Sequence, residues 1–182
     1  MLKTIGLAII VLLVASSGAH AEDFVRVSEN IGFRSPQFWV NIPDAGHIET
    51  NSFPWREFTL YGWSLEVRIP RGTKGTWHAV YKYPAPSEYL LNHPPEDAEV
   101  SSDLSQVTEK PKPFSANDGT LQGLCLLMRG EPPGKYKITV FVSITPDNNQ
   151  NTASSNNLYK ADQNVAVHSF TYEILEEKKA KN

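Results

Sequence analysis

The sequence contains little cysteine and no large excess of positive or negative charge. The first feature excludes a disulfide-stabilised scaffold, and the second argues against a protein that binds nucleic acid or anionic lipid. Cys125 is the only cysteine among 182 residues, so no internal disulfide can form. With neutral histidines, 17 basic and 20 acidic residues give a net charge of −3. This balance predicts no binding of nucleic acid and no polybasic attraction to anionic lipid. A chain of this length can instead be stabilised by a hydrophobic core.

Motifs for metal binding and catalysis are also missing. Beyond residue 21 the histidines lack the spacing of a zinc site, and the sequence has no nucleophile elbow, phosphate-binding loop, dinucleotide fingerprint or EF-hand loop. We therefore expect no cofactor and no metal. Cys125 lies within an apolar run without a basic neighbour, which predicts a buried, inert, structural thiol. His78 and His168 are expected to face solvent, opposite the apolar side of their strands.

The first 21 residues have the features of a signal peptide. Lys3 is followed by an apolar run over residues 5–15 and by the small-x-small sequence Ala19-His20-Ala21. A retained membrane anchor is the alternative, but the run is shorter than the ~20 residues of a spanning helix. We expect cleavage after Ala21, no stable membrane insertion afterwards, and a periplasmic or secreted protein. The absence of Asn-x-Ser/Thr after residue 21 fits a bacterial protein better than a eukaryotic extracellular one.

Alternating hydrophobic residues predict strands in most of the remaining chain. Residues 123–144 read as two strands joined at the turn 130–134, whose glycines and prolines break any helix. Residues 63–83 are predicted to form a second hairpin, with Trp63, Trp77, Tyr81 and Tyr83 in the core. A last strand is expected over 165–175, followed by a charged tail at 176–182.

Two segments lack this alternation. Residues 84–122 are rich in proline and are expected to be largely irregular, with a short helix near 96–109 because apolar residues there recur at helical spacing. Residues 145–164 are rich in asparagine and read as a solvated loop. No internal repeat or domain boundary is visible, so residues 22–175 are expected to form one domain.

The strand pattern predicts an all-β fold, a single antiparallel β-sandwich with two long irregular loops. The sequence Pro-Gly-Lys-Tyr-Lys-Ile-Thr-Val at 133–140 resembles a strand common near the end of immunoglobulin-like domains. The chain resembles small secreted Ig-like β-sandwich domains of Gram-negative bacteria with unassigned function, and it departs from true immunoglobulin domains in lacking the inter-sheet disulfide. The resemblance implies a structural role for Tyr136, at a corner or between the sheets.

Three functions remain open at this point. The leading hypothesis is a non-catalytic module that binds another envelope or secreted protein or a cell-surface component. The second is a carbohydrate-binding module that uses exposed Trp39 and Trp55, because tryptophan is common in such contacts. The third is a hydrolase without a recognisable motif, whose carboxylates are distant in sequence.

The predicted binding site lies at one pole of the sandwich. If residues 123–144 form a hairpin, then 84–122 arrive and 145–164 depart at the same pole, where sandwich loops often bind ligands. The predicted apolar contacts are Tyr89, Leu90, Leu91, Phe114, Leu158 and Tyr159.

Overall fold

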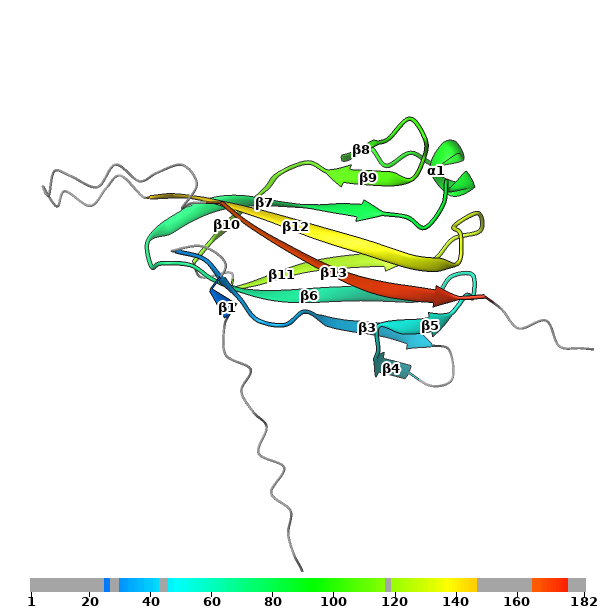
Figure 1. Cartoon of the computed structure of the whole chain (residues 1–182), viewed down its shortest axis with the longest axis horizontal. Coiled ribbons are helices and arrows are strands. Elements are labelled where there is room, and N and C mark those ends of the chain that lie inside the picture. The colour runs from blue at the N-terminus through cyan, green and yellow to red at the C-terminus, as the bar shows by residue number, and fades with distance from the viewer. Residues whose placement is uncertain (1–24, 27–29, 43–45, 117–118, 147–164, 177–182) are drawn as a thin grey trace, which may run out of the picture.

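Two β-sheets pack face to face in the computed structural model, which describes residues 25–26, 30–42, 46–116, 119–146 and 165–176 (Figure 1). The first sheet contains β1 (Val25–Arg26), β2 (Gly32–Phe33), β3 (Gln37–Ile42), β4 (Gly46–Glu49), β6 (Leu60–Arg68) and β11 (Thr120–Leu126). The second contains β5 (Ser52–Pro54), β7 (Thr73–Lys82), β8 (Ala98–Val100), β9 (Gln106–Glu109), β10 (Lys112–Ser115), β12 (Gly134–Pro146) and β13 (Val165–Leu175). A short helix, α1 (Glu88–Asn92), follows β7. The all-β sandwich prediction is confirmed.

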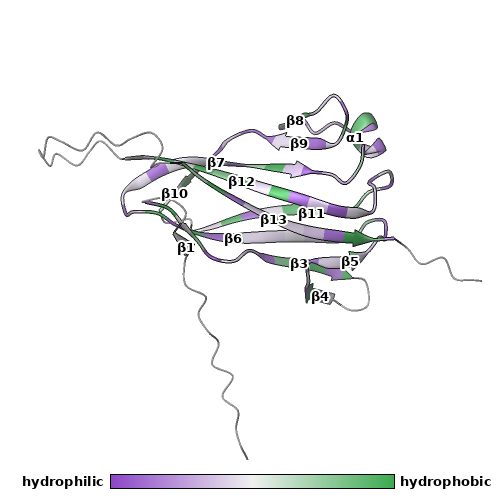
Figure 2. Ribbon diagram, viewed as in Figure 1, coloured by the Kyte–Doolittle hydropathy of each residue, from purple (hydrophilic) through white to green (hydrophobic). Residues whose placement is uncertain are grey.

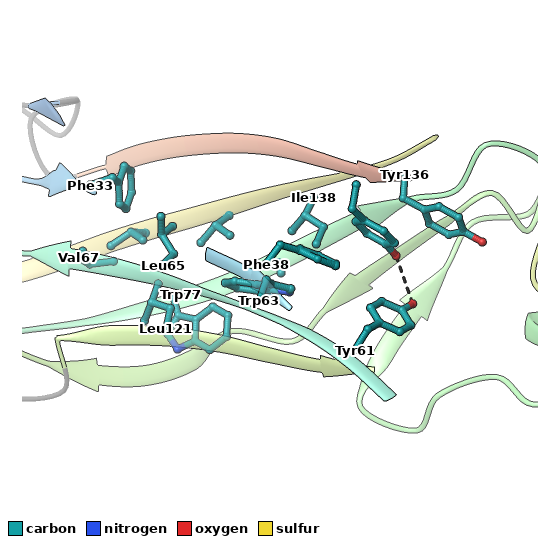
Figure 3. Close-up of a cluster of buried hydrophobic side chains, with 14 of the residues drawn as sticks. Phe33, Phe38, Tyr61, Trp63, Leu65, Val67, Trp77, Leu121, Tyr136 and Ile138 are labelled. Atoms are coloured by element: carbon teal, nitrogen blue, oxygen red, sulfur yellow. Dashed lines mark hydrogen bonds between the residues drawn. The ribbon is translucent and has the colours of Figure 1, made fainter. Parts of the chain in front are cut away.

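The core lies between the sheets and is formed by alternate residues of the long strands. On β12 the inward residues Tyr136, Ile138, Val140, Val142 and Ile144 are all buried. They meet the inward residues of β6 from the facing sheet (Figure 3). Hydrophobic and hydrophilic residues interchange along these strands (Figure 2), as expected when one side of each strand is buried and the other is solvated.

Both predicted hairpins are wrong in their pairing, although their strands exist. β6 and β7 are connected by a turn at 69–72 but belong to opposite sheets. Likewise, β11 pairs with β6, whereas β12 pairs with β7 and β13. The chain therefore crosses from one sheet to the other at both connections. Buried and exposed residues alternate in the same way along the strands of a hairpin and along two strands that cross between sheets. The pattern alone therefore cannot distinguish the two arrangements.

The proline-rich segment is more regular than predicted. The expected helix at 96–109 is instead the hairpin β8–β9, in which Val100 pairs with Val107. Leu104 lies in the connecting loop with a φ of 57°. Both β9 and β10 then pair with β7. The apolar spacing that resembled a helix therefore comes from residues that face each other across a hairpin.

The prediction for His168 is wrong, because this side chain lies on the inward side of β13 together with Phe170 and Tyr172. Its ring centroid is 5.3 Å from that of Phe33, and burial lowers its pKa. His78 is half-buried and stacks on Phe141 with ring centroids 4.8 Å apart.

Two strand edges define one lateral side of the sandwich. β11 is an edge of the first sheet, since β2 and β3 lie on the other side of β6. The β8–β9 hairpin forms an edge of the second sheet, and in Figure 1 it lies beside α1 at one margin of the molecule.

Candidate functional site

A cleft of ≈ 970 Å³ opens between these two edges. One wall is the edge strand β11, and the opposite wall is α1 with residues 92–98 and the β9–β10 edge. Aromatic side chains from three other strands or their ends reach it from the core. The lining tyrosines are Tyr61, Tyr81, Tyr83, Tyr89 and Tyr172. A large concave site with convergent polar groups is the usual form of a binding pocket.

Glu131 is the carboxylate buried deepest at this cleft, and only 7% of it is exposed. Its Oε2 accepts a hydrogen bond of 2.7 Å from the Met128 backbone N–H, and its own N–H donates to the Met128 carbonyl. Burial raises its pKa from 4.5 to about 7, because a carboxylate loses hydration there. No ion pair involving Glu131 occurs among the residues that the structure describes.

Local backbone geometry fixes this carboxylate. Gly130 has a φ of 95°, and a Cβ there would lie 2.9 Å from the Tyr89 backbone nitrogen. Glycine therefore permits the turn at Glu131 to pack against the start of α1. The Trp55 indole N–H also donates to the Glu131 carbonyl at 3.1 Å. The turn is thus tied to α1 on one side and to the end of β5 on the other.

Three of the lining tyrosines have hydroxyls that are hydrogen-bonded within the protein. Tyr61 Oη lies 3.2 Å from Tyr172 Oη (Figure 3), and the Trp63 indole N–H donates to Tyr81 Oη at 3.3 Å. Burial raises the pKa values of Tyr61, Tyr81, Tyr83 and Tyr172. These side chains therefore stay neutral, and the interior of the cleft is aromatic and polar without positive charge.

Cys125 comes from β11 and lines the same cleft. Desolvation is the largest influence on its thiol and raises its pKa to about 12, and the neighbouring Glu131 carboxylate adds to the shift. A thiol that is protonated at neutral pH is a poor nucleophile.

The charged residues of the cleft lie farther out. Lys112 Nζ is 3.0 Å from Glu109 Oε1 and 5.0 Å from the centre of the Trp77 ring. The other carboxylate oxygen of Glu109 is buried without a hydrogen-bond partner. Within the described residues, no cluster of His, Cys, Asp and Glu is suited to a metal ion.

The two tryptophans proposed for carbohydrate binding do not form one platform. Trp39 is half-buried on the outer face of the first sheet, where its ring lies over Gly62 and 5.1 Å from the ring of His47. Trp55 packs against the core and uses its indole N–H on Glu131. The pair therefore presents no shared exposed surface for a sugar ring.

The predicted loop site is also divided. Tyr89 and Leu90 line the cleft, with Leu90 buried, while Leu91 is exposed on the same helix. Phe114 is buried in the core beside Gly75, at the opposite end of the sandwich. Leu158 and Tyr159 lie outside the described residues. The expected joint site at one pole is therefore not formed by the residues that can be placed.

Neither the role of Glu131 nor the grouping of the tyrosines was predicted from the sequence. Glu131 is the one acidic residue in the Gly-Glu-Pro-Pro-Gly turn, where an acidic side chain usually signals only solvent exposure. Tyr81 and Tyr83 were expected in the core and are only half-buried, because they reach its open side. Cross-sheet neighbours of this kind have no signature in a single sequence.

Together these features define a β-sandwich module with a lateral cleft. Residues 40–151, more than half of the chain, match the sequence model of the PM0630 beta sandwich domain family, and the chain belongs to this family. The comparison with curated proteins found no match. In the part of the chain that is described, no helix has the length and apolar character needed to cross a membrane.

Proposed function

We propose that this protein is a non-catalytic binding module that takes up an extended segment of a partner protein as an additional strand beside β11. The observation that carries the proposal is the unprotected edge of β11 next to the cleft. Strand addition to an exposed sheet edge is a recurrent mode of peptide recognition, in which main-chain hydrogen bonds provide affinity and pockets select side chains.

The direction of the backbone groups on β11 follows from its flanking residues. Gly119 accepts a hydrogen bond from Val67 at 2.8 Å, and the Leu127 N–H donates to Thr59 at 2.9 Å. Because such pairs alternate along antiparallel strands, the odd-numbered residues of β11 bond to β6. The N–H and C=O groups of Gln122, Leu124 and Leu126 therefore point away from β6, where no described strand pairs with them.

The sequence of this edge has none of the usual protection. Natural edge strands carry charges, prolines or bulges that oppose further pairing. β11 has neither a charged residue nor a proline, and Leu124 and Leu126 are 67% and 44% exposed. By contrast, the edge strands β4 and β8 carry the exposed Glu49 and Glu99, respectively.

The shape of the cleft favours a single strand over a second folded domain. α1 and residues 92–98 face β11 across the opening, so an approaching sheet meets this wall before it reaches the edge. An extended segment fits between the two walls. Alternate side chains of that segment enter the cleft, since neighbouring residues of a strand point to opposite faces.

The partner's location rests on the sequence. The expected signal peptide, residues 1–21, lies outside the described residues, and we propose on its sequence alone that the module meets a secreted or envelope protein. Carbohydrate binding is the weaker candidate because Trp39 and Trp55 are separated and partly covered.

A backbone substitution tests strand addition directly. Leu124→Pro removes an N–H that does not bond to β6, so the sandwich should tolerate it as edge strands tolerate proline. Nonapeptides selected from a displayed random library on the wild-type protein should be extended and rich in β-branched residues. They should lose at least tenfold in affinity for Leu124→Pro but not for Leu124→Thr, which keeps the N–H. Equal binding to both variants would contradict strand addition.

A further inference from the structure

We infer that the floor of the cleft is a subsite for a primary ammonium group, in which the Glu131 carboxylate receives the cation among the surrounding tyrosines. This inference rests on the proposed function, because the occupant is the side chain of a lysine on the inward side of the added segment. The lysine gives the partner segment a specific anchor and a preferred register.

Glu131 lacks a compensating positive charge among the residues that the structure describes. A buried ionised carboxylate is normally paired with a cation, because its desolvation is otherwise unfavourable. The causes of its pKa shift are burial and the Met128 N–H, with no cation among them, and the groups whose pKa values it raises in turn are Tyr61, Tyr83, Tyr136 and Cys125. The basic side chains closest to it along the chain and at the cleft are engaged elsewhere: Arg129 pairs with Glu57 at 3.8 Å, and Lys112 with Glu109 at 3.0 Å.

The hydrogen bonding of the Glu131 carboxylate favours one form of cation. Oε2 of Glu131 already accepts the Met128 N–H, which leaves Oε1 as the oxygen without a donor among the described residues. Arginine recognition is favoured by two free carboxylate oxygens side by side, whereas the lysine ammonium acts as a compact point donor. The subsite therefore suits an ammonium better than a guanidinium group.

The aromatic lining of the cleft also favours an ammonium group. Five tyrosines border the cleft, and their ring faces and hydroxyl oxygens carry partial negative charge. Aromatic side chains around a carboxylate are a favourable environment for an alkylammonium ion, whose methylenes also pack against the rings. The lysine stem spans the aromatic part of the cleft while its head reaches Glu131.

The subsite has a defined pH dependence. With a pKa of about 7, Glu131 is mostly protonated at pH 6 and mostly ionised at pH 8. Tyr61, Tyr83, Tyr136 and Cys125, which face it, have raised pKa values and remain neutral in this range. The other charged or titratable residues of the cleft, which lie farther out, are His93, Glu96, Asp97, Glu109 and Lys112. Ammonium binding is therefore expected to strengthen as the pH rises, in wild type and in His93→Gln.

The test uses n-butylammonium and two peptides on the whole protein. Carbon-13 NMR of the Glu131 carboxyl should show its titration midpoint falling as butylammonium is added, with no such change from the neutral n-butanol. The peptides are acetyl-Thr-Val-Thr-Lys-Thr-Val-Thr-amide and its counterpart with norleucine in place of lysine. At pH 8 the lysine peptide should bind the wild type at least tenfold more tightly, and Glu131→Gln should remove this difference.

The outcomes separate the subsite from the strand-addition mode. If butylammonium leaves the Glu131 midpoint unchanged and the two peptides bind equally, the ammonium subsite is overturned while strand addition stands. If butylammonium moves the midpoint but neither peptide binds, the subsite stands as one for free amines and the proposed function fails. The carboxyl titration needs no variant, so the result does not depend on the folding of Glu131→Gln.

Discussion

Tyr61 Oη and Tyr172 Oη lie 3.2 Å apart in the core, and this contact joins β6 of the first sheet to β13 of the second (Figure 3). Tyr61→Phe leaves the buried Tyr172 hydroxyl without its partner and should lower the free energy of unfolding by about 1–3 kcal/mol. Tyr172→Phe leaves the Tyr61 hydroxyl without its partner in the same way and should lower it by a similar amount. Urea unfolding of both variants measures the two losses.

The double variant provides the control. When both hydroxyls are removed, neither is left unpaired, so the two losses should not add and the double variant should be no less stable than Tyr61→Phe. Additive losses would show that the two hydroxyls are not coupled.

The raised pKa of Glu131 predicts how the stability of the folded protein changes with pH. Its pKa is raised to about 7 in the folded state from 4.5, so the folded protein binds this proton more tightly than the unfolded chain. The stability should therefore fall as the pH rises from about 4.5 to about 7, by about 3 kcal/mol in total, and then level off. In Glu131→Gln, which retains an acceptor for the Met128 N–H, this fall should vanish.

The contribution of Glu131 is obtained as the difference in unfolding free energy between the wild type and Glu131→Gln at each pH. The pKa of His168 is lowered by burial, so its contribution has the opposite sign: stability rises with pH as the pH approaches the ordinary value of 6.5. Because His168 is present in both proteins, it cancels in the difference. A difference that is flat between pH 4.5 and 7 would contradict the assignment to Glu131.

The sequence predicts strand faces far better than strand partners in this protein. The alternation along Tyr136, Ile138 and Val140 reports burial on one side, and the structure confirms it. Pairing depends on which sheet the chain enters after each turn, and the turns at 69–72 and 127–133 show no local mark of a crossing. Val100 and Val107 show the same limit, since their spacing fits a helix as well as it fits a hairpin.

The cleft was even harder to predict from the sequence than the pairing of the strands. Tyr61 is distant in sequence from Cys125 and Glu131, and these two lie in different patterns, an apolar run and a turn rich in glycine and proline. The three residues meet at the cleft only because β6 and β11 pair and the chain then turns toward α1. Cys125 was interpreted from its apolar neighbours, but Leu124 and Leu126 point to the opposite, exposed face of β11, because successive residues of a strand alternate between its two faces. An apolar run alone does not indicate whether both faces of a strand are covered.

Tyr136 provides a test of the assignment of strand faces. It is 1% exposed, and its hydroxyl donates to the Pro132 carbonyl at 2.6 Å, four residues upstream, as in the tyrosine corner of many sandwiches. Tyr136→Ala should lower the free energy of unfolding by about 3–5 kcal/mol through the cavity, and Tyr136→Phe by about 1 kcal/mol through the hydroxyl. Lys137→Ala on the exposed side should cost less than about 0.5 kcal/mol. Similar urea midpoints for Tyr136→Ala and Lys137→Ala would contradict this assignment.

The rate at which the native Cys125 thiol is labelled can report on the cleft. Its thiol has a pKa of about 12 and is half-buried, so at pH 8 a thiol reagent should label it far more slowly than a free cysteine and rapidly once urea unfolds the chain. A segment seated beside β11 covers the cleft that Cys125 lines, so a bound nonapeptide should slow the labelling further, in proportion to the occupied fraction. Leu124→Pro should keep the slow labelling of the free protein but lose the protection by peptide. Protection that persists in Leu124→Pro would show that the peptide covers Cys125 without pairing with β11.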